Sequence, residues 1–302
     1  MKDRKLLPQL KDRISFLYLE YAAIGIQHGA VVYTRKMMQA VIPCANLLAL
    51  FLGPGTTITQ AAVTTLTAMG CTLCWCSDGG LRSYAAGIGV ASSSHNLLCQ
   101  AGYCMDAVRH MDIVRRMYAM RFPDMDCKRL SLRQLRGREG VRVRKAYLEA
   151  SKESGIPWVS REYKIKDMAA NDEINQALTI ANWLLYGICE AAVLALGFSP
   201  ALGFIHTGKA LSFIYDIADL YKAETSIPAA FQAVSLGEGT LSQRVRRVFR
   251  NRLYQQKVLK RIPKDLGILF HVPNAEKIDV SVLWDGWHQT VPGGVNYADE
   301  ET

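Results

Sequence analysis

The sequence lacks a long, uninterrupted hydrophobic run. Its longest apolar stretch, 183–198, is interrupted by Glu190, and a membrane-spanning helix needs about 20 apolar residues. The first residues, MKDRKLLPQLKDR, are too charged to contain the apolar core of a signal peptide. We therefore expect a cytoplasmic protein that has no membrane partner.

A zinc-binding arrangement of cysteines is also missing. The chain has 8 cysteines, but only Cys71, Cys74 and Cys76 cluster, and no second pair completes the four ligands of a structural zinc site. The segment CTLCWC is apolar and strand-like, with Cys74 and Cys76 on one face. This pattern favours reduced, buried thiols with a structural role.

Acidic residues are too few to balance the basic ones. Lys and Arg number 36 and Asp and Glu 27, so the 302-residue chain carries a formal net charge of +9. Hydrophobic residues make up 50% of the chain and charged residues 21%, which excludes a disordered protein and is ordinary for a globular one. The excess of positive charge suits a polyanionic partner such as nucleic acid.

The pattern of short segments predicts an α+β fold that begins with a β-rich domain over 1–88. Segments rich in β-branched and aromatic residues, separated by Gly, Pro and Asn, lie between 13 and 84. Within this region we expect one helix over 59–69, ended by Gly70, and a hairpin turn at 78–80.

Helical spacing dominates the rest of the chain. We expect a larger, all-helical domain over 89–270 and a flexible tail over 271–302, which is punctuated by Pro and Gly. The expected helices cover about 91–123, 131–153, 171–197, 210–224 and 241–262. The third of them is apolar nearly all round, which indicates a buried central helix.

One carboxylate stands out on the expected second helix. Residues that step by three or four form a stripe that is apolar except at one position. The stripe consists of Leu132, Leu135, Glu139, Val143, Ala146 and Ala150. A carboxylate on a core-facing stripe is costly unless it is paired, protonated or bound to a metal. The alternative to a metal ligand is a salt bridge from Glu139 to Arg136 or Arg142, each three residues away.

A second acidic site lies in the stretch GFIHTGKALSFIYDIADLYK, 203–222. Asp216 and Asp219 are three residues apart on a helix, so both face the same way, and His206 lies in a Gly-rich turn before that helix. Neighbouring carboxylates favour a nearby cation. With Glu139 they form a mixed nitrogen and oxygen set that suits Mg²⁺ or Mn²⁺. The alternative is an acidic face that merely complements the helix dipole.

Basic residues gather in two helical segments. Eight lie between 128 and 145, with Glu139 as the one acid, and nine lie between 244 and 264 with no acid. Some of them simply form solvated faces, but so much charge of one sign repels itself unless it meets phosphates. The residues of these segments that we expect to bind DNA are Arg136, Arg138, Arg142, Arg244 and Arg247.

These motifs match a known family. The stretch QLRGREGVRVRKAY at 134–147, the Ile-Asn-Gln run at 174–176 and GFIHTGKALSFIYDIADLYK resemble the CRISPR-associated integrase family, the first-numbered of the Cas proteins. An R-G-x-E-G helix, then H-T-G-K, then D-I-A-D follow in that order. KDRISFLYLEY, the Gly-Pro-Gly-Thr turn and the hairpin at 79–84 extend the resemblance over nearly the whole chain, in particular to the type I-E branch.

The resemblance implies an architecture and a set of partners. It implies an N-terminal β domain that dimerises and a C-terminal helical catalytic domain. It also implies homodimers, two of which flank a dimer of the small second-numbered Cas protein in a heterohexameric complex. The DNA partners would be a protospacer duplex and the CRISPR repeat into which that duplex is inserted.

The resemblance also implies roles for individual residues. The metal ligands would be Glu139, His206 and Asp219, with Asp216 assisting beside them. Lys209 and Arg136 would contact phosphates. Tyr21, at the end of the first strand, would stack on the end of the duplex, although an ordinary half-buried strand aromatic is an equally good reading of this residue.

The implied reaction is a metal-dependent phosphoryl transfer in which a DNA 3′-OH attacks a phosphodiester of the repeat. Two alternatives stay open. A stand-alone endonuclease acting on branched DNA would use the same residues with water as the nucleophile. A non-catalytic DNA-binding scaffold would need the positive charge alone.

Overall fold

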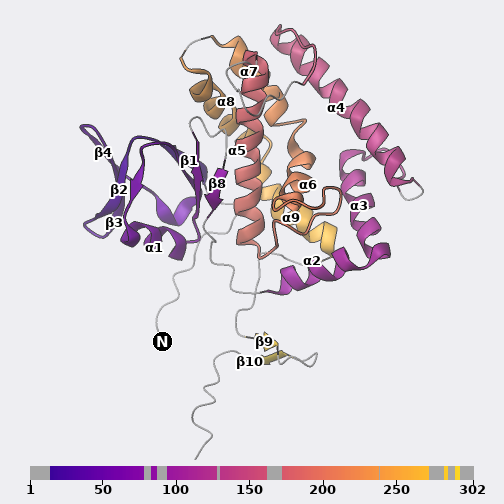
Figure 1. Cartoon of the computed structure of the whole chain (residues 1–302), viewed down its shortest axis with the longest axis horizontal. Helices are drawn as coiled ribbons and strands as arrows, with labels where there is room; N and C mark the ends of the chain where they lie inside the picture. The colour runs from indigo at the N-terminus through magenta and orange to yellow at the C-terminus, as the bar shows by residue number, and fades with distance from the viewer. Residues whose placement is uncertain are drawn as a thin grey trace, which may run out of the picture.

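Strands dominate the N-terminal part of the molecule and helices the remainder (Figure 1), so the predicted α+β class is confirmed. The computed structural model describes residues 14–77, 83–86, 94–127, 130–161, 172–237, 239–271, 282–284 and 290–292.

Two four-stranded sheets form the N-terminal part. Their strands are β1 (Ile14–Leu19), β2 (Ala23–Gln27), β3 (Ala30–Arg35), β4 (Met38–Val41), β5 (Leu47–Leu52), β6 (Thr57–Ile58), β7 (Thr72–Cys76) and β8 (Ser83–Ala86). The first sheet has the order β1-β5-β7-β8, with β8 antiparallel to three parallel strands, and the second has the order β4-β3-β2-β6. The expected antiparallel pairing of β7 and β8 is confirmed, while the turn at 78–80 lies outside the described residues.

Both faces of the first sheet are covered. One face packs with helix α1 (Gln60–Ala68) and the second sheet, in a cluster that includes Ile24 and Leu66. The other face contributes Phe51 to the large core of the helical part. Helix α5 (Glu173–Ala195) lies directly on this face, because a Cβ atom at Gly187 would come within 2.5 Å of the Phe51 ring.

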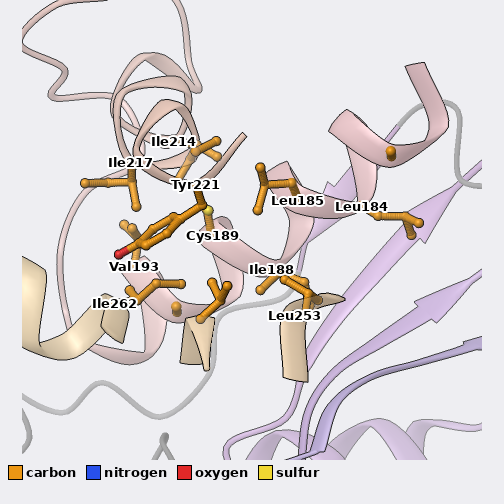
Figure 2. Packing of buried hydrophobic residues seen from close by; sticks show 14 of the residues in the cluster. Leu184, Leu185, Ile188, Cys189, Val193, Ile214, Ile217, Tyr221, Leu253 and Ile262 are labelled. Carbon is orange, nitrogen blue, oxygen red and sulfur yellow. The ribbon is translucent and has the colours of Figure 1, made fainter. Parts of the chain in front are cut away.

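Helix α5 runs through the middle of the helical part (Figure 1), as the sequence predicts. Ile188 and Cys189 are buried among Ile217, Tyr221 and Leu253, which come from other helices (Figure 2). Of the part of the chain that the structure describes, α5 is the one helix long and apolar enough to cross a membrane, but 78% of its apolar window is buried inside the fold. Such burial is that of a core helix.

The helix boundaries differ from the expected ones in three places. The remaining helices are α2 (His95–Met105), α3 (Ala107–Arg121), α4 (Leu132–Ser154), α6 (Ser212–Tyr221), α7 (Ser226–Ser235), α8 (Leu241–Gln255) and α9 (Val258–Phe270). The single helix expected over 91–123 is divided at Asp106, whose Oδ1 accepts the N–H groups of Val108 and Arg109 and starts α3. The helix expected over 241–262 is divided at Lys257, whose φ is 51°. The sequence pattern does not predict α7.

The proposed domain limits fall where the structure gives little information. The boundary between 1–88 and 89–270 lies at residues outside the described ranges, so this division stays a prediction. Most of the tail, 271–302, is also outside them, and its described part is a short antiparallel pair, β9 (Val282–Trp284) and β10 (Thr290–Pro292).

Candidate active site

The long helix α4 carries Glu139 near its middle, and the residues at its ends explain its length. The Ser131 hydroxyl accepts the backbone N–H of Gln134, whose side chain accepts the Ser131 N–H in return, so the helix starts with a capping box. Gly155 ends the helix in the left-handed conformation, with φ 72°. Glu139 points inward, with its side chain 16% exposed.

Two arginines hold the Glu139 carboxylate. Arg142 donates from Nε to Oε2 at 3.0 Å and from Nη2 to Oε1 at 2.8 Å. Arg121, on α3, places Nη1 3.4 Å from Oε1. Arg136 points elsewhere and donates to the carbonyl oxygen of Ile205 at 3.2 Å. The salt bridge to Arg142 that the sequence offered as an alternative therefore exists.

The loop 203–206 wraps around the carboxylate of Asp216. This side chain is 0% exposed. It accepts the backbone N–H groups of Phe204 and Ile205 at Oδ2, at 2.6 and 3.0 Å, and that of His206 at Oδ1, at 2.9 Å. Gly203 permits the tight turn, because a Cβ atom there would lie 2.2 Å from the His206 carbonyl oxygen. The carboxylate of Asp216 thus organises the loop.

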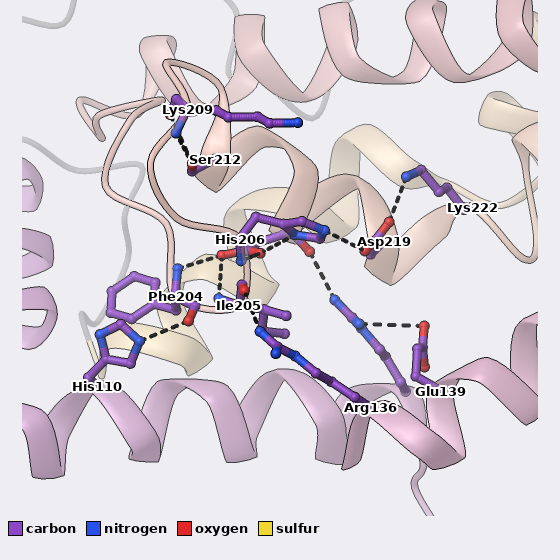
Figure 3. A network of polar contacts seen from close by, with 12 residues as sticks. His110, Arg136, Glu139, Phe204, Ile205, His206, Lys209, Ser212, Asp219 and Lys222 are labelled. Carbon is purple, nitrogen blue, oxygen red and sulfur yellow. Dashed lines mark hydrogen bonds and ion pairs between the residues drawn. The ribbon is translucent and has the colours of Figure 1, made fainter. Parts of the chain in front are cut away.

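The ring of His206 lies between two carboxylates (Figure 3). Its Nδ1 is 2.8 Å from Asp216 Oδ1. Because both oxygens of Asp216 already accept backbone N–H groups, Nδ1 is the donor of this hydrogen bond. In the neutral ring Nε2 then keeps its lone pair, and it lies 4.0 Å from Asp219 Oδ2. An imidazole oriented by a carboxylate through its second nitrogen is typical of metal-binding histidines.

Asp219 faces the same His206 ring as Asp216, on the Nε2 side, and it also pairs with Lys222. Lys222 Nζ lies 2.7 Å from Asp219 Oδ1. Burial raises the pKa of Asp219, but the cations of Lys222 and Arg121 outweigh burial and hold that pKa below its ordinary value. Asp219 is therefore ionised at neutral pH.

Two arginines place the Glu139 side chain beside the backbone of α6, the helix that carries Asp216 and Asp219. Arg142 Nη2 contacts Glu139 Oε1 and also lies 3.4 Å from the Asp219 carbonyl oxygen. Arg121 contacts Glu139 and donates to the Asp216 carbonyl oxygen at 3.2 Å. Among the described residues, no three His, Cys, Asp or Glu side chains already form a cluster that could hold a metal ion.

The donor set nevertheless fits a hard divalent cation. Two carboxylates and an imidazole with an oriented Nε2 are ligands that Mg²⁺ or Mn²⁺ accept. The carboxylates of Glu139 and Asp219 are held by Arg142 and Lys222. These side chains supply positive charge at the places where a metal ion would supply it.

Comparisons with known proteins identify the family. A family model described as "CRISPR associated protein Cas1" matches residues 119–262. A protein of Thermus thermophilus, "CRISPR-associated endonuclease Cas1 2", is 42% identical over 310 residues, which cover 99% of this chain and 95% of that relative. The chain belongs to the Cas1 family. Another relative, "CRISPR-associated endonuclease Cas1" of Escherichia coli, is 39% identical over 254 residues, 84% of this chain and 83% of the relative.

Solved structures agree with the family. The chain matches "Crystal structure of TtCas1-DNA complex" with a TM-score of 0.66 and 45% identity, over 88% of this chain and 100% of that one. It matches "Casposase bound to integration product" with a TM-score of 0.65 at 16% identity, over 87% and 96%, and that likeness concerns the fold alone. The family and the fold that the motifs predict for this Cas1 chain are both confirmed.

The basic residues predicted to bind DNA occupy different surroundings. Arg138, Lys209 and Arg247 are exposed. Arg136 is exposed overall, although its guanidinium donates a hydrogen bond to the Ile205 carbonyl oxygen. Arg244 is 6% exposed and pairs with Glu173. Its guanidinium is therefore not presented to solvent, as contact with a DNA phosphate would require.

Tyr21 is presented to solvent at the end of β1. It is 63% exposed, which does not fit the half-buried strand aromatic. Its φ is 50°, a conformation uncommon for a residue other than glycine, and its N–H donates to the Pro54 carbonyl oxygen at 2.8 Å. A Cβ atom at Gly55 would lie 2.6 Å from the Tyr21 ring, so this glycine leaves room for the ring.

The cysteine cluster is buried, as the sequence predicts. Cys71, Cys74 and Cys76 are reduced thiols with low exposure. Burial raises the pKa of Cys74 well above its ordinary value and that of Cys76 to about 12. These thiols are therefore protonated at neutral pH, which agrees with a structural role.

Two residues at the site were missed by the sequence analysis. Lys222 lies one turn beyond Asp219, and this spacing of three residues could have predicted the pair. Arg121 is on α3, distant in sequence from its partners Glu139 and Asp216. No local pattern could have predicted that contact, because it depends on how α3 packs against α4 and α6.

Proposed function

We propose that this chain is a DNA integrase of CRISPR adaptation. The 3′-OH of a captured protospacer duplex attacks a phosphodiester of the CRISPR repeat. A P–O bond to the protospacer forms, the P–O bond to the 3′-oxygen of the repeat strand breaks, and that strand leaves with a free 3′-OH. The observation that carries the proposal is the meeting of Glu139 from α4 with Asp216 and Asp219 from α6 through Arg121 and Arg142. Relatives named CRISPR-associated endonucleases, and a similar chain solved with DNA, support DNA as the substrate.

In this proposal Glu139, His206 and Asp219 hold Mg²⁺ or Mn²⁺. The ion, when bound, would polarise the scissile phosphate and stabilise negative charge in the transition state. Asp216 assists without ligating, because its oxygens already accept three backbone N–H groups and His206 Nδ1. It fixes the ring so that Nε2 faces Asp219. Lys222 helps to keep Asp219 ionised before the ion arrives.

The basic face of α4 would bind the DNA backbone next to these carboxylates. The exposed basic residues of α4 are Arg133, Arg136, Arg138, Arg144, Lys145 and Lys152. Lys209 projects from the loop before α6 (Figure 3), and Arg247 adds an exposed charge on α8. Contacts to phosphates carry no sequence information, so we expect duplex binding that tolerates sequence and weakens steeply with salt.

Tyr21 would stack on the terminal base pair of the protospacer duplex. Its ring is exposed and its backbone is fixed by Pro54, so little conformational entropy is lost when a base stacks on it. Stacking of a base on an aromatic ring contributes about 1–3 kcal/mol and does not depend on sequence.

The assembly would contain a homodimer and the small second-numbered Cas protein in a heterohexamer. The edge strand β4 supports a surface for a second copy, because Met37, Met38 and Val41 are 100%, 70% and 64% exposed. Exposed apolar side chains beside a sheet edge favour association. The proposed location is the cytoplasm, where the CRISPR array lies.

The test is a strand-joining assay with Mn²⁺, a protospacer duplex and a plasmid that carries the repeat. The parent protein is expected to join a donor that ends in 3′-OH and to fail with a 3′-deoxy donor. Asp219→Ala is expected to lose joining by at least about 100-fold. Asp112→Ala, which removes an exposed carboxylate of α3, serves as the matched control and is expected to join like the parent.

The outcomes distinguish the three functions that the sequence left open. Joined product that depends on the 3′-OH supports the integrase. Cleavage of branched DNA without joining identifies a stand-alone endonuclease instead. If Asp219→Ala and Glu139→Gln both leave every activity unchanged, the assignment of these residues is wrong and a DNA-binding scaffold is the better description.

A further inference from the structure

Helix α2 has polar side chains on its buried face and apolar ones in solvent. Asn96 and Gln100 are 2% and 0% exposed, whereas Leu98 and Met105 are 58% and 86% exposed. A helix that packs on a core normally shows the opposite pattern. The buried side of α2 therefore makes specific polar contacts in addition to apolar packing, such as that of Tyr103 against the core.

These buried side chains hold the backbone of the segment that leads from α5 to His206. Asn96 Nδ2 donates to the Leu196 carbonyl oxygen at 2.7 Å. Gln100 Nε2 donates to the carbonyl oxygens of Ser199 and Leu202 at 3.0 and 2.9 Å, and its Oε1 accepts the Ser199 N–H at 2.7 Å. Gln100 thus uses both ends of its amide on this one segment.

The next contacts along the segment come from α3 and α4. His110 Nε2 lies 2.8 Å from the Phe204 carbonyl oxygen, and its Nδ1 lies 3.3 Å from the Cys104 carbonyl oxygen. Arg136 donates to the carbonyl oxygen of Ile205. In Figure 3 His110 and Arg136 both reach the loop from below, and the His206 ring lies above them.

Peptide geometry links these contacts to the carboxylate of Asp216. In a planar trans peptide the carbonyl of one residue and the N–H of the next point in opposite directions. Holding the Phe204 carbonyl therefore aims the Ile205 N–H, and holding the Ile205 carbonyl aims the His206 N–H. Both N–H groups donate to Asp216, whose Oδ1 also binds His206 Nδ1.

We propose that Gln100 and His110 are positioning residues for His206, which fix the loop 203–206 so that Nε2 of His206 faces Asp219. The inference rests on the proposed role of His206 as a metal ligand. Loss of a partner that orients a metal ligand typically weakens metal binding by about 10–100-fold, and the same size of effect is expected here.

The test compares two substitutions that replace different nitrogens of His110. The amide nitrogen of His110→Gln can occupy the place of Nε2 and still donate to the Phe204 carbonyl. The shorter side chain of His110→Asn can occupy only the place of Nδ1, beside Cys104. Val108→Ala, on an exposed position of the same helix, is the control.

Two readouts use the full chain without DNA. Binding of Mn²⁺ alone is followed by electron paramagnetic resonance, and the side-chain nitrogen resonances of His206 are recorded by NMR without metal. We expect His110→Asn to raise the Kd for Mn²⁺ by at least about 10-fold and to shift the His206 resonances. His110→Gln and the control are expected to stay within about 3-fold of the parent.

A second position and the metal-free readout keep the test decisive. Gln100→Glu puts an oxygen against two carbonyl oxygens and is expected to act like His110→Asn. If His110→Asn and Gln100→Glu leave both readouts at parental values, or if His110→Gln is as impaired as His110→Asn, the positioning role is overturned. If the parent itself does not bind Mn²⁺, the proposed function fails, and the His206 resonances alone still decide the positioning role.

Discussion

Nδ1 of His206 lies 2.8 Å from Oδ1 of Asp216, and that oxygen also accepts the His206 backbone N–H. One buried carboxylate therefore fixes both the ring and the backbone of the same residue. Because Oδ2 accepts the N–H groups of Phe204 and Ile205, the position of His206 and the shape of its loop are set together. A substitution of Asp216 should consequently lower the stability of the fold as well as the catalytic activity.

The substitution Asp216→Asn tests this double role. An amide has one acceptor oxygen, so its NH₂ group would face backbone N–H donors that lose their partner. Leaving such buried donors unpaired costs about 1–3 kcal/mol of the free energy of unfolding. We expect a loss of this size in urea denaturation together with a fall in strand joining of at least about 10-fold.

The control for that variant is Asp112→Asn, on an exposed carboxylate of α3. It should leave the unfolding free energy within about 0.5 kcal/mol of the parent value. Parental stability in Asp216→Asn would contradict the structural role, and parental strand joining would contradict the orienting role.

If Glu139 binds a metal ion as proposed, Arg142 must compete with that ion for the Glu139 carboxylate. Its guanidinium binds both oxygens of Glu139, and a ligand that is already paired must release its partner before it can bind a cation. Arg142→Ala should therefore lower the Kd for Mn²⁺ in the absence of DNA, by about 5-fold if the pair contributes on the order of 1 kcal/mol. Isothermal titration of the protein with Mn²⁺ measures this change.

Arg138→Ala provides the comparison, because Arg138 is exposed on the same helix and contacts Met125 instead of Glu139. It removes one positive charge at a similar place in the chain and should alter the Kd for Mn²⁺ by less than about 3-fold. Equal effects of the two substitutions would mean that general charge, and not the pair with Glu139, controls the affinity.

The candidate site could be predicted as a set of residues but not as a set of contacts. Glu139 was visible because it interrupts an apolar stripe, and Asp216 and Asp219 because they are three residues apart. Their different surroundings depend on tertiary packing. Asp216 binds a loop that precedes its helix, and Asp219 binds Lys222. Only the second of these contacts has a local spacing that sequence analysis can detect.

The fold shows the same division between local and tertiary causes. Helix α5 was predictable because its apolar surface runs all round, and its cap at Asp172 follows a standard pattern. The break at Asp106 could have been predicted from its capping ability, although the periodicity of the flanking residues continues across it. The start of α7 has no side-chain cap, and Pro228 in its first turn is the one local signal of a new helix there.

Gly187 allows α5 to lie on the first sheet, so Gly187→Ala should destabilise the protein. The added Cβ would lie 2.5 Å from Phe51 ring atoms, and overpacking of a core typically costs about 1–3 kcal/mol. Gly137→Ala is the matched substitution, because nothing lies within 4 Å of a Cβ at that helical position. It should stabilise the protein by about 0.5–1 kcal/mol. Urea denaturation that shows the same sign for both variants would refute the close contact.

Glu190 should make the stability of the parent protein depend on pH. Burial on α5 raises the pKa of its carboxyl group above the ordinary value. The folded state therefore binds the proton more tightly than the unfolded state, and the stability from this group is lost as pH rises through the raised pKa. Glu190→Gln carries no charge at any pH, so its Tm should exceed the parental Tm more at pH 8 than at pH 4. Because all other titrating groups are the same in both proteins, their contribution cancels when the two Tm values are subtracted at each pH. A difference in Tm that stays constant across this range would show that the carboxyl group keeps its ordinary pKa in the fold.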